Sequence, residues 1–336
     1  MTAEIIFASN KLGIIYDDQL QLMLDKYNLG KMISSRKTAN GAMGQTMFVS
    51  STEGDFVFKG NPLYNGQFRE EKFFVENLKK RTNVSVPMPY IVDNSQEIFE
   101  WSYTLMPRLQ GEHLNSEHLK NSLDLDDKYR IAELIAETLS EFHTWKADGF
   151  GELNLEKFDI IPFKGTYASW LYNRIMFWLE DAKKYSKITS EDFDWVNSLL
   201  YDSQDAFVDF SSPTFVMGDF KLENFLIYSE VSRWEISGVF DFTNSYFADP
   251  ISDLIKMIIF YLNNDESEIA KHLVSVYCSE SEEKKDIKKR IRVHMLHQRV
   301  IDWGCAKAMN MVSWNNELPF SQWAKTYTDS AASLLE

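Results

Sequence analysis

Residues 216–226 read Val-Met-Gly-Asp-Phe-Lys-Leu-Glu-Asn-Phe-Leu, and residues 238–241 read Gly-Val-Phe-Asp. The first stretch sets a polar turn between apolar residues, and the second ends a β-branched and aromatic run on an acid. In a phosphoryl-transfer centre one carboxylate accepts the proton of the attacking hydroxyl, while an amide oxygen and a second carboxylate hold magnesium. Asp219, Asn224 and Asp241 suit these roles in this order. The sequence therefore predicts Asp219 as the base and the other two residues as Mg²⁺ ligands.

The residues that follow strengthen this interpretation. An Asp and an Asn five positions apart also occur in ordinary turns, because both side chains hydrogen-bond to nearby backbone. Here, however, Asp249-Pro250 and Asp253-Leu254 follow Asp241 at fixed offsets, before an apolar helical run. The segment resembles the aminoglycoside phosphotransferase and choline kinase-like family of small-molecule kinases. Its pattern is His-Gly-Asp, four residues, Asn, then Asp, seven residues, Asp-Pro-x-x-Asp-Leu. The resemblance implies transfer of the γ-phosphate of ATP or GTP to a small-molecule hydroxyl.

A lysine and a glutamate upstream complete the predicted nucleotide site. Residues 46–50 and 55–59 have strand character and predict a hairpin whose second strand ends in Lys59. Twelve residues later, Glu71 begins an amphipathic helical segment, so an ion pair between Lys59 and Glu71 can join strand and helix. Glu70 is the second choice of partner. By the resemblance, Lys59 contacts the α- and β-phosphates and Glu71 orients it.

Two further segments are predicted to contact the nucleotide. Gly41-Ala-Met-Gly44 lies where the turn that covers the nucleotide is expected, although it has neither the G-x-G-x-x-G nor the Walker pattern. Its backbone amides make Gly41 and Gly44 candidate phosphate contacts. Residues 101–111 resemble the strand and hinge that join the two lobes in the family, and Met106 is the candidate contact there.

Two positions depart from the family pattern, which the chain follows over about residues 35–260. Met217 stands where the family usually has the histidine that supports the catalytic loop, and Ala248 stands where glycine is usual. The flexible thioether of methionine can fill the same gap by apolar packing. We therefore expect Met217 to be tolerated. A nucleotide-binding pseudokinase that acts as a scaffold is the alternative, and Met217 is the sequence feature in its favour.

Length and patterning predict two lobes. A chain of 336 residues exceeds one simple core. Residues 1–106 form the predicted N-terminal lobe, in which residues 36–106 combine short strands with one helix, whereas residues 107–336 are mainly helical and carry a strand–loop–strand insert at 214–242. Amphipathic segments at 18–27 and 129–145 predict a helix that caps the N-terminal lobe and a long helix of the C-terminal lobe. The predicted fold is α+β, bilobal and protein-kinase-like.

The net charge of −15 has two interpretations. It can serve solubility alone, or it can attract a cationic acceptor. It disfavours nucleic acid, which requires basic clusters. The basic residues within 284–292 fit a solvent-facing helical stripe.

The remaining sequence features favour a cytoplasmic protein. The best apolar run, residues 254–262, is far shorter than the ~18 residues of a membrane span, and residues 1–10 do not have the pattern of a signal peptide. Cys278 and Cys305 have no metal-like spacing and are interpreted as free thiols. We expect a monomer or homodimer and no membrane partner.

The acceptor and a few minor features stay open. An antibiotic, an aminoglycoside or a macrolide, is the first hypothesis from the resemblance. A metabolic alcohol of the choline, homoserine, methylthioribose or fructosamine type is the second. His294 and His297 lie three apart in a probable helix, but no further metal ligands are nearby, so ordinary histidines are favoured.

Overall fold

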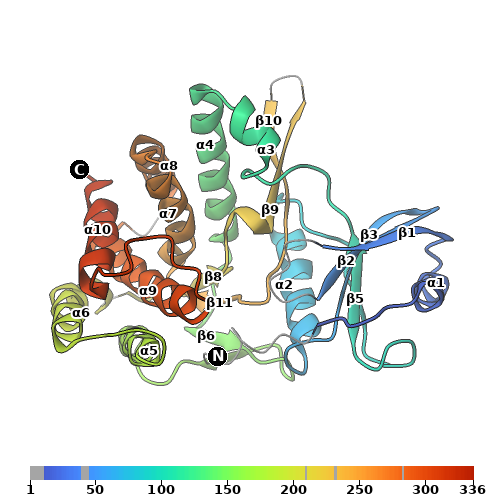
Figure 1. Ribbon diagram of the computed structural model, residues 1–336, viewed down its shortest axis with the longest axis horizontal. Coiled ribbons are helices and arrows are strands. Elements are labelled where there is room, and N and C mark those ends of the chain that lie inside the picture. Colours follow the sequence, from blue (N-terminus) through green and yellow to red (C-terminus); the bar gives the residue numbers. More distant parts are fainter. Residues whose placement is uncertain (1–10, 39–44, 209, 231–232, 282–283) are drawn as a thin grey trace.

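The structure is a computed structural model that describes residues 11–38, 45–208, 210–230, 233–281 and 284–336. The chain has an α+β fold, with an antiparallel sheet at one end and a larger, mainly helical part at the other (Figure 1). Strand β5 (Tyr103–Pro107) ends where the chain leaves the sheet for the helices. A division into lobes at residues 106 and 107 stays a prediction.

The N-terminal sheet has five strands in the order β1-β2-β3-β5-β4, and each hydrogen-bonded pair is antiparallel. The predicted hairpin is present as β2 and β3, in which every second residue of β2 is buried. Helix α1 (Asp17–Lys26) turns Leu20, Met23 and Leu24 into the core of this sheet, as its amphipathic pattern predicts. The other strands are β1 (Met32–Lys37), β2 (Thr46–Ser51), β3 (Gly54–Gly60) and β4 (Ile91–Asp93).

Helix α2 (Gln67–Arg81) lies between the sheet and the helical part (Figure 1). Its apolar face, Phe74, Val75 and Leu78, belongs to the same core as Met106 of β5 and the helices beyond. Glu71 of the same helix is 2% exposed and pairs with Lys59 of β3. One helix therefore ties the strand that carries Lys59 to the rest of the molecule.

The helical part has two cores. The first is formed around α4, α7 and α8, and the second around α5, α6, α9 and α10. In the second core Trp314 stacks on Trp323 at 4.3 Å between ring centroids, and Trp303 is 2% exposed. The helices are α3 (Glu117–Ser122), α4 (Leu125–Phe142), α5 (Tyr167–Ala182), α6 (Ser190–Ser203), α7 (Ile255–Asn263), α8 (Ser267–Glu280), α9 (Ile287–Ala308) and α10 (Phe320–Ser333).

Helix α4 begins and ends earlier than the predicted range 129–145. The carboxylate of Asp124 caps its first turn by accepting the N–H of Asp127 at 2.8 Å, so the helix begins at Leu125. It ends at Phe142, immediately before His143. None of the described helices is both long and apolar enough to cross a bilayer.

Two small sheets interrupt the helices and position the loops of the site. One has the strand order β7-β6-β11-β8, and the other is the β9–β10 hairpin. The insert at 214–242 was predicted, whereas β6, β7 and β11 were not. Their bounds are β6 (Gly151–Leu153), β7 (Ile160–Pro162), β8 (Thr214–Val216), β9 (Phe225–Glu230), β10 (Arg233–Val239) and β11 (Tyr246–Ala248). Pairing of β8 with β11 places the loop after β8, which carries Asp219, next to the loop before β11, which carries Asp241.

Candidate active site

The loop that carries Asp219 begins at the end of β8 and is shaped by a glycine. Gly218 has a φ of +75°, and a Cβ there would lie 2.3 Å from the carbonyl oxygen of Asn244. Any other residue would clash and strain the backbone at this point. After the loop, a short 3₁₀ turn (Leu222–Asn224) leads into β9. The glycine thus lets the chain turn within the two residues between β8 and Asp219.

Asp253 holds the backbone of this loop. Its carboxylate accepts the N–H of Met217 at 2.7 Å and the N–H of Gly218 at 2.8 Å. His143 Nε2 lies 3.3 Å from the same carboxylate, and the hydroxyl of Tyr277 lies 2.7 Å from His143 Nδ1. Asp253, from the Asp-Pro-x-x-Asp-Leu segment, therefore fixes the position of the loop that carries Asp219.

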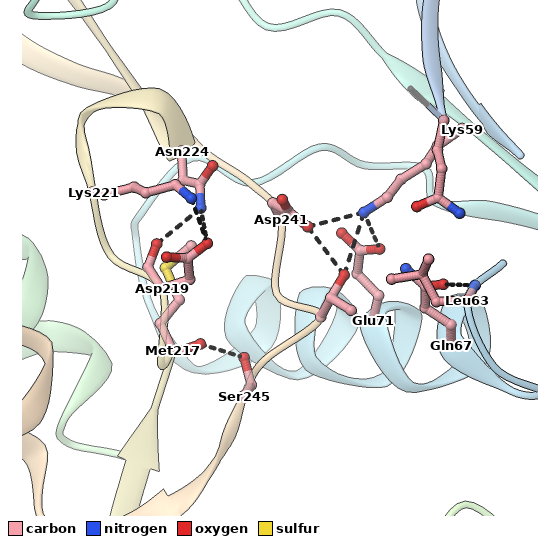
Figure 2. Close-up of polar contacts among 12 residues, drawn as sticks. Lys59, Leu63, Gln67, Glu71, Met217, Asp219, Lys221, Asn224, Asp241 and Ser245 are labelled. Atoms are coloured by element: carbon pink, nitrogen blue, oxygen red, sulfur yellow. Dashed lines mark hydrogen bonds and ion pairs between the residues drawn. The ribbon is translucent and has the colours of Figure 1, made fainter. Parts of the chain in front are cut away.

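Met217 fills a core position in place of the usual histidine. Its side chain is fully buried, and the Ser245 hydroxyl donates a hydrogen bond to its carbonyl oxygen at 3.4 Å (Figure 2). Asp253 holds the loop through the backbone N–H groups of Met217 and Gly218, an anchor that does not depend on the side chain at position 217. Ala248, the other departure, is buried in β11 opposite Thr214.

Asp219 is surrounded by one amide and two lysines. Asn224 Nδ2 donates to the carbonyl oxygen of Asp219 at 2.8 Å and to its Oδ2 at 3.2 Å (Figure 2). Lys221 Nζ lies 2.8 Å from Oδ2, whereas Lys256 Nζ forms an ion pair with Oδ1. Desolvation opposes the charge of Lys221, but the carboxylates of Asp219 and Asp241 outweigh it and raise the pKa of this lysine.

Lys59 lies at the centre of the second cluster (Figure 2). Its Nζ is 3.2 Å from Glu71 Oε2, 2.9 Å from Asp241 Oδ1 and 3.3 Å from Thr243 Oγ1. Burial alone would lower the pKa of Lys59, but Asp241 and Glu71 raise it above its ordinary value. The predicted ion pair between Lys59 and Glu71 is present. Glu70, the second choice, instead accepts a hydrogen bond from the hydroxyl of Tyr64 at 2.7 Å.

Asp241 has an uncommon backbone conformation and lies next to Asn224. Its φ of +69° falls in the left-handed region, which a residue with a side chain rarely adopts unless its surroundings enforce it. The N–H of Phe240 donates to the carbonyl oxygen of Asn224 at 3.0 Å, so the two candidate ligands lie side by side at the base of the β9–β10 hairpin. Desolvation would raise the pKa of Asp241, but the charge of Lys59 outweighs it and lowers that pKa.

The side-chain oxygens of Asn224 and Asp241 suit a magnesium ion. Asn224 uses its Nδ2 as a donor and keeps Oδ1 as a possible ligand. Asp241 Oδ1 contacts Lys59 and Thr243, while Oδ2 has no hydrogen bond within the described chain. Mg²⁺ usually takes one or two protein oxygens together with phosphates and water. The donor set fits this pattern. Nowhere among the described residues do three or more His, Cys, Asp or Glu side chains form a metal-type cluster.

The other predicted nucleotide contacts are less defined. Gly41 and Gly44 lie outside the described residues. Met106 lies in β5, paired with Val57 and 6% exposed, and its contact with the nucleotide stays a prediction.

A buried ion pair corrects the prediction for the basic run. Arg290 is 1% exposed and binds both carboxylate oxygens of Asp249, with its Nε 2.9 Å from Oδ2. His294 Nε2 lies 2.9 Å from the same oxygen, so His294 pairs with Asp249 rather than with a metal. Arg290 therefore does not belong to a solvent-facing stripe, because the fully buried Asp249 requires a cation.

Sequence patterns missed Lys256 and His113 as parts of the site. Lys256 is the lone charge in the apolar run 254–262, and that isolation was the available sign of a buried partner. His113 Nδ1 lies 3.1 Å from the carbonyl oxygens of both Leu222 and Phe225, on either side of Asn224. A loop histidine with no motif around it gives no such sign.

Comparison with known proteins matches this geometry to a family. The model of the phosphotransferase enzyme family (APH) matches residues 36–284, most of the chain. The chain belongs to this family. The phosphotransferase is thus an enzyme that acts on small molecules. A search of curated protein sequences finds no match.

Three solved structures show the fold of the phosphotransferase. Macrolide 2′-phosphotransferase MphH from Brachybacterium faecium is 14% identical, with a TM-score of 0.61 over 95% of this chain and 98% of that chain. A thermostable mutant of aminoglycoside phosphotransferase APH(4)-Ia, in ternary complex with ADP and hygromycin B, is 13% identical, with a TM-score of 0.62 over 93% and 97%. A protein from Haemophilus somnus 129PT, provisionally assigned as a fructosamine-3-kinase, is 14% identical, with a TM-score of 0.59 over 93% and 96%. The predicted protein-kinase-like α+β fold is confirmed.

Proposed function

We propose that the phosphotransferase moves the γ-phosphate of ATP or GTP to a hydroxyl of a small molecule. The observation that carries the proposal is the convergence of Lys59, Glu71 and Asp241 in one ion-pair cluster beside the turn of Asn224. These residues come from β3, α2 and the loop after β10, which are far apart in the sequence. The matched structure of APH(4)-Ia with ADP and hygromycin B supports a nucleotide and a hydroxylated acceptor as ligands.

In this proposal each side chain has one task. Lys59 binds the α- and β-phosphates, and Glu71 orients Lys59. Asn224 and Asp241 hold Mg²⁺, which neutralises phosphate charge when bound. Asp219 orients the acceptor hydroxyl and accepts its proton. Gly41, Gly44 and Met106 are proposed as further nucleotide contacts.

A nucleotide-binding scaffold without catalysis is a weaker alternative. Its sequence support was Met217, and that side chain packs in the core without removing the anchor that Asp253 gives to the loop. Every side chain needed for transfer is also present. Two free cysteines, Cys278 and Cys305, are compatible with the cytoplasm, where we place the reaction by a monomer or homodimer.

The charge around Asp219 bears on the choice of acceptor. Two acids of the helical part are already paired with lysines: Asp205 pairs with Lys289, and Glu266 pairs with Lys128. Around Asp219 itself the neighbouring charges are Lys221 and Lys256. Among the acceptors suggested by the family, these cations disfavour a polycationic aminoglycoside.

The test is a mass-spectrometric screen of hydroxylated small molecules for gain of one phosphate that depends on nucleotide and magnesium. With the acceptor in hand, Asp219→Asn should lower kcat by orders of magnitude and leave nucleotide affinity unchanged. Asp241→Ala and Lys59→Ala should weaken nucleotide binding, and Asn224→Ala should weaken it less, because Asn224 is a neutral ligand. Near-normal turnover in Asp219→Asn would refute its role as the base.

A further inference from the structure

Lys256 is a charged residue in the otherwise apolar stretch 254–262, at the start of helix α7. Its side chain is 26% exposed, and its Nζ forms an ion pair with Asp219 Oδ1. Ion pairs of exposed lysines add little to stability, and buried ones often add no more than apolar residues of the same size. An apolar side chain would therefore serve the packing of α7 equally well. The partner of this lysine, the proposed base, points instead to a role in the reaction.

Lys256 and Asp253 hold the catalytic loop from one helical turn. They are three residues apart, where a short 3₁₀ turn continues into α7, so their side chains lie on the same face. Asp253 accepts the N–H groups of Met217 and Gly218. Lys256 binds the carboxylate of the next residue, Asp219. One short segment therefore contacts both the backbone of the loop and the acidic side chain that the loop carries.

The two oxygens of the Asp219 carboxylate have different numbers of partners. Oδ2 accepts a hydrogen bond from Asn224 Nδ2 at 3.2 Å and lies 2.8 Å from Lys221 Nζ. Oδ1 contacts Lys256 and no other residue of the described chain. Because each carboxylate oxygen has about two lone-pair sites, Oδ2 is fully used while Oδ1 keeps one site. Oδ1 is therefore the oxygen that is open to the acceptor hydroxyl.

Lys221 and Lys256 together set the plane of this carboxylate. The torsion that rotates an aspartate carboxylate is broad and has no sharp minimum of its own. With Lys221 on one oxygen and Lys256 on the other, the plane is held from two elements, the loop after β8 and helix α7. Displacement of a reacting group by about 1 Å can lower a rate about a hundredfold. Loss of either contact should therefore reduce turnover.

We propose that Lys256 is a positioning residue, which orients Asp219 so that Oδ1 accepts the proton of the acceptor hydroxyl. This inference rests on the proposed function, because it concerns the base of that reaction. In the transfer, the acceptor oxygen bonds to the γ-phosphorus while the bond from this phosphorus to the bridging oxygen of the leaving ADP or GDP breaks. The hydroxyl proton passes to the open lone pair of Oδ1 and is later released to water. Lys256 acts through Asp219 and is not required for nucleotide binding.

The first test measures turnover as phosphate release from ATP or GTP with Mg²⁺. Water replaces the unidentified acceptor here, and its proton has to reach the same oxygen. Lys256→Met keeps a long side chain without the charge and should lower kcat about tenfold to a hundredfold, with an unchanged Kd for AMP-PNP and Mg²⁺ in calorimetry. Lys256→Arg restores a cation and should recover most of the turnover. Lys128→Met removes a comparable lysine, from its ion pair with Glu266, and should leave kcat unchanged.

The second test is structural and needs no turnover. A crystal structure of Lys256→Met should show the Asp219 carboxylate rotated, with the backbone of the loop still bound to Asp253. A crystal structure of Lys256→Arg should show the carboxylate in its original orientation. Urea denaturation should show similar, small losses of stability in Lys256→Met and Lys128→Met, so a difference in kcat between these two variants reports positioning and not folding.

Several results would overturn the inference. These are a wild-type rate in Lys256→Met, a fall in rate no larger than that of Lys128→Met, or an unrotated Asp219 in the crystal structure of Lys256→Met. Recovery of the Asp219 orientation in Lys256→Arg without recovery of turnover would also contradict it. Absence of AMP-PNP binding to the unmodified protein would instead refute the proposed function, and the crystal structures would still show whether Lys256 orients Asp219.

Discussion

Asp253 offers a direct test of how the catalytic loop is positioned. Its two oxygens accept the N–H groups of Met217 and Gly218 at 2.7 and 2.8 Å. In Asp253→Asn only one oxygen remains, and the amide NH₂ group faces the other N–H. A buried N–H without a partner costs about 1–3 kcal/mol. A displacement of a reacting group by about 1 Å can lower the rate about a hundredfold. We therefore expect Asp253→Asn to lower the free energy of unfolding by about 1–3 kcal/mol. We also expect it to lower kcat about a hundredfold.

Asp192→Asn is the matched control for this experiment. Asp192 is fully buried and also accepts two backbone N–H groups, from Thr189 at 2.9 Å and Ser321 at 2.8 Å, at the junction of α6 and α10. Urea denaturation should show similar destabilisation in both variants, whereas phosphate transfer to the acceptor should slow only in Asp253→Asn. Equal kcat values in the two variants would refute the view that Asp253 positions Asp219.

Two further predictions concern stability. Burial raises the pKa of Glu70 from 4.5 to about 7, against the hydrogen bond from Tyr64. Between pH 4.5 and about 7 the folded state therefore holds a proton that the unfolded chain releases, so the free energy of unfolding falls as the pH rises through this range. Glu70→Gln should flatten that decline in urea unfolding, and parallel profiles would contradict it. Arg290→Met removes the guanidinium from the buried Asp249 and leaves only His294 beside it, and it should cost about 3–5 kcal/mol. Lys289→Met, which breaks an exposed ion pair, should cost about 0–1 kcal/mol, and equal losses would contradict the prediction.

The sequence predicted those parts of the site that are close together in the chain. Asp219 and Asn224 share one loop, and their spacing alone limits how far apart they can lie. The Lys59–Glu71 pair was predictable because a strand that ends in lysine, followed by an amphipathic helix, leaves few ways to pack the two. Asp241 was predicted because it ends a second apolar run, but its place beside Asn224 does not follow from spacing, since the β9–β10 hairpin separates the two residues.

The missed residues all depend on distant partners. Helical periodicity assigned Arg290 to an exposed stripe, because it reports the face of a helix and not whether an acid lies buried against that face. Lys256 lies on α7, and its partner Asp219 lies 37 residues earlier, in the loop after β8. Strands β6, β7 and β11 have three residues each, too few for an alternating pattern to be recognised.

The ion pair between Asp249 and Arg290 separates two boundaries that are often treated as one. Sequence similarity to the family ends at residue 284, but the cation that neutralises Asp249 comes from α9, beyond that limit. A fragment cut at residue 284 would leave this carboxylate without Arg290 and His294, and it would uncover the apolar faces of α5 and α6 that α9 and α10 shield. The solved structures described above cover 93–95% of this chain, so the C-terminal helices are part of the shared fold even though the sequence pattern of the family ends before them.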